Sequence, residues 1–86
     1  MPRISEFYGI VIWLYYDEHP PPHFHATYGE HVVQVAIDSL DAIAGSLPNS
    51  AMRLVREWGQ LHRGELATMW DRAVAHQPLG KIEALP

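Results

Sequence analysis

The apolar residues of this chain change their spacing halfway along it, and this change limits the fold more than any other feature. Between residues 8 and 38 they are mostly β-branched or aromatic and fall in short runs of strand length. Between residues 51 and 73 they recur every three or four positions, as in a helix. Strands followed by helices predict an α+β fold with an antiparallel sheet.

The predicted sheet has three to four strands. The first spans residues 8–16, and both of its faces are apolar, so we expect a central strand that is covered on both sides. The second spans residues 23–28, and a tight turn at Gly29 and Glu30 leads into the third at residues 31–38. A less regular pattern predicts a short fourth strand at residues 41–44.

The helical half is expected to cover this sheet. It starts at Pro48, and Asn49 or Ser50 is the expected N-cap because their side chains accept hydrogen bonds from free backbone amides. One straight helix as far as Ala73 would exceed the width of about 30 Å that so small a domain has. We therefore expect two helices or one bent helix, with the break near residues 62–64.

Length and composition predict one small domain. The 86 residues divide into a β half at about 1–47, an α half at about 48–77 and an extended tail at 78–86. The absence of cysteine excludes disulfides and thiolate metal sites. We expect neither a signal peptide nor a membrane span, and hence a cytoplasmic protein. The net charge of −4 argues against strong binding to nucleic acid.

Four of the six histidines lie within residues 19–31, together with three consecutive prolines. Histidine exchanges protons and binds metal ions near neutral pH, and consecutive prolines hold the backbone extended. Strand alternation places His23 and His25 on one face, with Phe24 on the other. We expect the functional site in this segment.

The first interpretation of the cluster is a metal site formed by His19, His23 and His25. Two histidines on one strand face could bind the same ion, and the third would complete the set with an open position for water. Asp17 or Glu18 would add an oxygen ligand. Apart from such a divalent ion, for example zinc, we expect no cofactor. The structural alternative leaves the imidazoles bonded to backbone groups or packed on Tyr28.

The second interpretation is free of metal. His23 and His25 would act as general acid and general base in the cleavage of a phosphodiester, as in small ribonucleases. Tyr28 or Arg3 would then stabilise the developing charge. Since the chain has no phosphate-binding glycine loop and no serine nucleophile elbow, nucleotide-dependent chemistry and serine hydrolysis are set aside.

The other aromatic and histidine residues suggest packing and contact roles. Trp58 and Trp70 are expected to pack the helices on the sheet, with contact to a partner as the alternative. Trp13 and Tyr28 are the candidate residues for binding a partner protein. His62 lies on the apolar helix face, where we expect a core or hinge residue. Two further histidines are expected to face solvent: His31 and His76.

Motifs along the whole chain share the pattern of a known family. They are Phe7-Tyr8-Gly9-Ile10, Asp17-Glu18-His19, Pro21-Pro22-His23-Phe24-His25-Ala26, Glu57-Trp58, Leu61-His62 and Lys81-Ile82-Glu83. In these residues the chain resembles a widespread family of small bacterial proteins, domain of unknown function 4160. Gly64 and Ala84 depart from the pattern, where a helix former and a proline are usual.

The resemblance implies a partner more than a reaction. Genes of this kind are often found beside the gene of another small protein, of the domain of unknown function 2442 type. The pairing resembles a two-gene toxin–antitoxin arrangement, so we expect a protein-interaction component with that neighbour as its partner. A histidine-dependent hydrolase that acts on nucleic acid is the alternative, and the sequence leaves open whether the chain is an enzyme.

Overall fold

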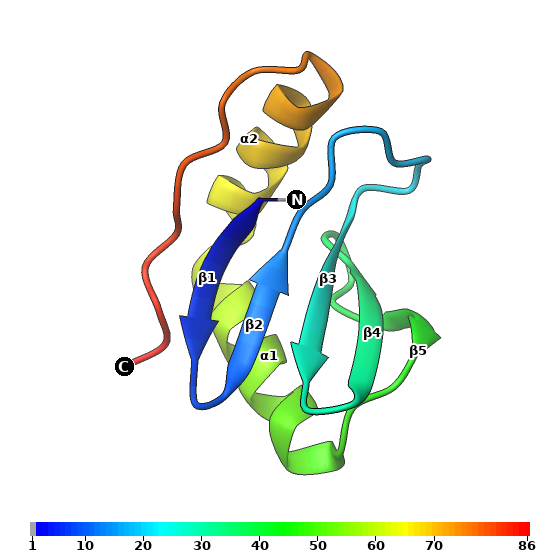
Figure 1. The fold of residues 1–86 in the computed structure, drawn as a ribbon, viewed down its shortest axis with the longest axis vertical. Coiled ribbons are helices and arrows are strands. Elements are labelled where there is room, and N and C mark those ends of the chain that lie inside the picture. The colour runs from blue at the N-terminus through cyan, green and yellow to red at the C-terminus, as the bar shows by residue number, and fades with distance from the viewer. Residues whose placement is uncertain (1) are drawn as a thin grey trace.

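A computed structural model describes residues 2–86, and it has a five-stranded antiparallel sheet with two helices against one of its faces (Figure 1). The α+β class is confirmed, whereas the expected three to four strands were too few. The strands lie side by side in chain order: β1 (Arg3–Phe7), β2 (Ile10–Trp13), β3 (His23–Tyr28), β4 (His31–Ala36) and β5 (Ala42–Gly45). The helices are α1 (Asn49–Leu61) and α2 (Arg63–Val74).

The extra strand is β1, which pairs with β2 across a turn at Tyr8 and Gly9. Both turn residues have positive φ angles, 50° and 79°, as the common two-residue hairpin turn requires. A bulge between Arg3 and Ser5 breaks the alternation of β1. Because Ile4 and Ser5 are both buried as a result, this segment has no period-two pattern that could have predicted it.

Strand β2 lies between β1 and β3, but only one of its faces is covered, so the expectation of cover on both sides was wrong. Ile10 and Ile12 are fully buried on the helix side. Val11 and Trp13, on the other face, are half-buried because both helices pack on the same side of the sheet. We call the face that carries Val11 and Trp13 the open face.

The core lies between the sheet and the helices and is centred on Trp58. Its ring lies 5.5 Å from that of Phe7 and 5.7 Å from that of Phe24, and it is fully buried. The indole nitrogen donates to the carbonyl oxygen of Glu83 at 2.9 Å, which satisfies a polar group that would otherwise be buried without a partner. Trp70 is also buried, so both tryptophans pack as predicted.

The two helices are separated at His62, as predicted for residues 62–64. Its φ and ψ of −122° and 22° are not helical. A continuous helix over the 26 positions from 49 to 74 would be about 39 Å long, whereas the longest extent of the molecule is 33 Å. The predicted cap was wrong: α1 begins at Asn49, and Pro48 is its N-cap, with its carbonyl accepting from the amide of Met52.

The tail, residues 78–86, runs along the outer side of β1 without forming a strand (Figure 1). Leu79 and Ile82 are buried, and the amide of Ile82 donates to the carbonyl of Ile4 at 2.7 Å. One edge of the sheet is therefore covered by the chain itself. Among residues 2–86, no helix has the length and apolar character that a membrane span needs.

Candidate functional site

The loop between β2 and β3 brings three potential ligand groups together: Glu18, His23 and His25. One nitrogen or oxygen atom of each lies within 4.8 Å of those of the other two. The two histidines share a face of β3, as their spacing predicts, and Glu18 reaches them from the other side of the three prolines. His19 is exposed and lies outside this group, so the structure replaces it with a carboxylate.

His23 is held by one ring nitrogen, while the other makes no hydrogen bond. Its side chain is 5 % exposed, and its ring packs on that of Trp70 at 5.4 Å. Nδ1 donates to the carbonyl oxygen of Pro21 at 2.7 Å; since a carbonyl can only accept, the proton is on Nδ1. In the neutral ring Nε2 then carries a lone pair, and it is buried without a hydrogen-bond partner among the described residues.

His25 is bound to the same carboxylate. Its Nε2 lies 2.8 Å from Oε1 of Glu18, and the other carboxylate oxygen lies 3.5 Å from Nε2 of His23. The ring of Tyr15 meets the His25 ring edge to face at 4.3 Å and restricts its orientation. Glu18 thus turns one oxygen toward each histidine.

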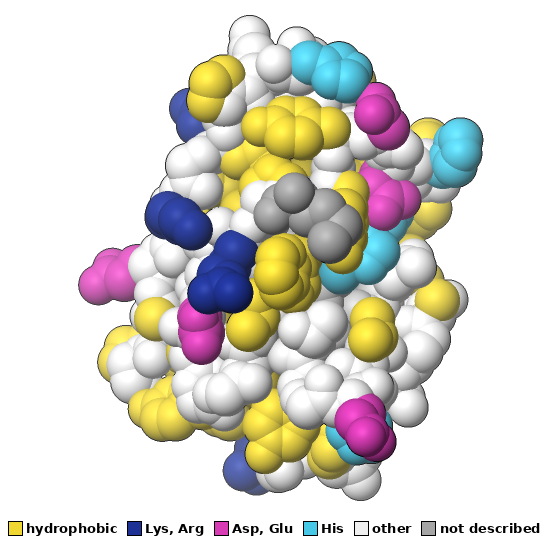
Figure 2. Space-filling model, viewed as in Figure 1, with side chains coloured by type: hydrophobic (Ala, Val, Ile, Leu, Met, Phe, Trp, Pro, Cys, Tyr) yellow, Lys and Arg dark blue, Asp and Glu magenta, His cyan; other side chains and the backbone are white. Residues whose placement is uncertain are grey.

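The cluster is partly open to solvent through Glu18, whose side chain is 26 % exposed. Figure 2 shows histidine and acidic side chains adjacent to each other on the open face. Two imidazoles and one carboxylate can hold a divalent ion. The same groups can also exchange protons, since a carboxylate that binds one ring nitrogen orients an imidazole as a base.

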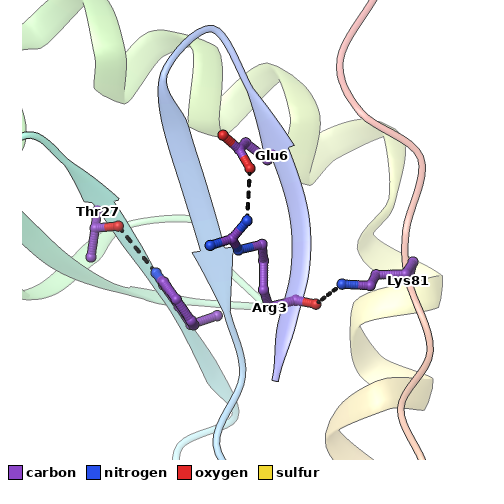
Figure 3. Close-up of polar contacts among 5 residues, drawn as sticks. Arg3, Glu6, Thr27 and Lys81 are labelled. Atoms are coloured by element: carbon purple, nitrogen blue, oxygen red, sulfur yellow. Dashed lines mark hydrogen bonds and ion pairs between the residues drawn. The ribbon is translucent and has the colours of Figure 1, made fainter. Parts of the chain in front are cut away.

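The residues predicted to stabilise charge are not part of the cluster. Arg3 lies two strands away from His25, with its guanidinium 5.4 Å from the centre of the Trp13 ring and 3.1 Å from Glu6 (Figure 3). Tyr28 is three residues beyond His25, about 10 Å along the strand. The cluster therefore has its own carboxylate and no nearby cation among these candidates.

The two predicted partner-binding residues, Trp13 and Tyr28, do not share a surface. Trp13 is on the open face, where its indole nitrogen donates to Thr27 at 3.1 Å. Tyr28 is paired with Ile10 and therefore points to the opposite side, the side of the helices, where it is 39 % exposed. A single partner surface cannot be built from this pair.

The remaining histidines have local roles. His62 lies between the helices, packs on Trp58 and pairs with Glu65 at 2.7 Å, in agreement with the predicted hinge. His31 is exposed, as expected. His76 is also exposed, but it stacks on Tyr16 and lies 3.4 Å from Asp17, which its position in the sequence did not indicate.

A second feature was not predicted from the sequence: a groove of about 480 Å³ between β5 and α1. Two arginines and one glutamate line it, Arg53, Arg56 and Glu57. Arg56 Nε donates to the carbonyl oxygen of Leu40 at 3.2 Å, which holds its guanidinium near the start of β5. The helical spacing of the charges was visible in the sequence, but the neighbouring strand was not.

Searches among curated proteins and among solved structures found no significant match. The family described as Domain of unknown function (DUF4160) matches residues 9–71, a range that contains β2, β3 and the whole cluster of Glu18, His23 and His25. This match covers well over half of the chain. The chain therefore belongs to the DUF4160 family.

Proposed function

We propose that this protein acts by binding a small partner protein, as one member of a two-gene pair of the toxin–antitoxin kind. Membership of the DUF4160 family supports a partner encoded by a neighbouring gene, of the domain of unknown function 2442 type, since the gene pairing belongs to that resemblance. The structural observation that carries the proposal is the outer edge of β5.

Strand β5 ends the sheet, and no described strand pairs with its outer side. The backbone N–H and C=O groups of such an edge can pair with an extended segment of another chain. All four residues of β5 are exposed, and none of them is charged. Ile43 is a large apolar side chain on this edge, 45 % exposed. The edge therefore has the features that favour strand addition.

The groove beside β5 indicates which side chains the added strand of a partner would carry. Arg53 and Arg56 outnumber Glu57 there, although the whole chain carries a net charge of −4. Acidic side chains of an added strand would lie near these guanidinium groups, and opposite charges at an interface favour the correct partner and its register. An extended segment with acidic residues is the partner element that fits this surface.

The test is co-purification of the chain with the protein of its genomic neighbour. We expect Ile43→Lys to weaken the complex about 30-fold, the equivalent of about 2 kcal/mol, because a lysine opposes both the apolar contact and strand pairing. Val74→Lys is the matched control: Val74 is 59 % exposed on α2, outside the groove. Equal binding by the two variants would contradict docking at β5.

Hydrolysis of nucleic acid is the second candidate function, and the 2.8 Å contact between His25 and Glu18 favours it. An imidazole oriented in this way is suited to general base catalysis. The negative charge of the chain argues against strong nonspecific contact with a polyanion. Partner binding therefore remains the leading proposal.

Growth of cells that express the chain with and without its neighbour separates the two candidates. If the chain is a hydrolase, it arrests growth when alone, the neighbour relieves the arrest, and the double variant His23→Ala, His25→Ala abolishes it. If it acts only by binding, growth continues in every case, and the double variant still co-purifies with the neighbour. Soluble expression of the double variant is the control for folding.

A further inference from the structure

We infer that Glu18, His23 and His25 form a binding site for one divalent transition-metal ion of the zinc class. This inference is independent of the partner-binding proposal, because it uses no residue of β5 and none of the groove residues. It rests on the environment of one atom, Nε2 of His23, and on the geometry of the groups around it.

Nε2 of His23 is a lone-pair donor that lacks a partner. It is buried, and it makes no hydrogen bond within the described part of the chain. Burying a polar atom without a hydrogen-bond partner is unfavourable, so native proteins rarely leave one without a function or a ligand. With one proton on Nδ1, the neutral ring presents a lone pair on Nε2, which is the form of histidine that binds a metal ion.

The distances around this atom fit a small ion. Zinc bonds of about 2.0–2.1 Å at tetrahedral angles place ligand atoms about 3.3 Å apart. The measured separations are 3.5 Å between His23 Nε2 and Glu18 Oε2, and 2.8 Å between His25 Nε2 and Glu18 Oε1. These two distances involve different oxygens of Glu18, but one ligand atom from each of the three groups lies within 4.8 Å of the other two, so small side-chain adjustments bring one carboxylate oxygen and the two ring nitrogens to this separation.

The donor set selects the class of ion. Two imidazole nitrogens and one carboxylate oxygen suit zinc and neighbouring transition metals. Calcium and magnesium are bound almost entirely by oxygen, so they fit this site poorly. The three protein groups leave a fourth tetrahedral position, which a water molecule or an external ligand can occupy.

The contacts that orient the two histidine rings resemble those around the ligands of a metal site. The carbonyl of Pro21 fixes the tautomer of His23, as a backbone carbonyl often does for a metal-bound histidine. Tyr15 fixes the ring of His25 from the side. The ion would replace the hydrogen bond between His25 Nε2 and Glu18, because both use the same two atoms, and the proton on Nε2 would move to Nδ1 or to water.

The experiment uses the full chain without a histidine tag, treated with a chelator and then titrated with zinc by isothermal calorimetry. We expect one zinc per chain, and a rise in Tm when zinc is added. Glu18→Gln and His25→Ala should each lower the affinity more than 100-fold, because loss of a direct ligand exceeds the roughly 10- to 100-fold cost of losing a supporting group. Glu18→Gln keeps an oxygen that accepts from His25, so it preserves the fold.

His31→Ala is the matched control, since it removes an exposed histidine of the next strand and should leave zinc binding unchanged. Cobalt supplies a second readout, because three protein ligands and a water give the absorption of tetrahedral Co²⁺. The inference is overturned if the wild-type chain binds no zinc saturably, or if Glu18→Gln and His25→Ala bind it as well as the wild type does. Circular dichroism confirms that each variant is folded.

Discussion

At the scale of single residues, His23 shows how a side chain can be held firmly and still keep a binding atom. Its ring is fixed by the Pro21 carbonyl at one nitrogen and by Trp70 against its face. The alternation of β3 is enough to predict that His23 and His25 point the same way. The position of Glu18 beside the two histidines depends on the path of the loop between β2 and β3, which contains the three prolines. No local pattern in the sequence determines that path.

Alanine in place of the two helical glycines, Gly59 and Gly64, is expected to change the free energy of unfolding in opposite directions. A Cβ at Gly59 would lie 2.7 Å from Cδ2 of Leu40, whereas one at Gly64 would meet nothing within 4 Å. We expect Gly64→Ala to raise the free energy of unfolding by about 0.5 kcal/mol, because alanine restricts the unfolded chain. Gly59→Ala should lower it by about 1–3 kcal/mol through overpacking.

Urea denaturation of the two variants measures both effects. If Gly59→Ala is as stable as Gly64→Ala, the packing of Leu40 against α1 is not as described. Position 64 has room for any helix-forming side chain.

At the scale of elements, the sequence predicts the strands and helices in which buried residues recur at a regular spacing. Strands β3 and β4 were identified within two residues of their ends, and the break between the helices was placed correctly. Strand β1 was missed because its bulge buries two consecutive residues, Ile4 and Ser5. The groove was missed because β5 and α1 meet only after the chain folds, so no local pattern reports their contact.

The tail is the element whose contribution is easiest to test. We expect Ile82→Ala to lower the free energy of unfolding by about 2 kcal/mol, because it removes a buried side chain that packs beside β1. Glu83→Ala should have little effect, since the bond from Trp58 is made to the backbone carbonyl of Glu83. Thermal unfolding of the two variants is the measurement. Equal Tm values would show that the tail does not stabilise the sheet.

At the scale of the whole molecule, two candidate regions lie at different places on one sheet. The cluster of Glu18, His23 and His25 is at the start of β3, and the groove is beside β5. The prediction of a site between residues 19 and 31 therefore located only the first region. Since the two regions share no residue, variants in one should not alter binding at the other, and the experiments above can be interpreted separately.

The tail also sets the stoichiometry of any assembly that extends the sheet. A fibril that grows by strand pairing needs two open edges on every molecule. Among residues 2–86, the tail lies along the β1 side, with the amide of Ile82 bonded to Ile4, whereas the outer side of β5 is unpaired. Addition of one strand to β5 would use that unpaired edge. We therefore expect strand addition at β5 to give a one-to-one complex and not a fibril that grows through the sheet.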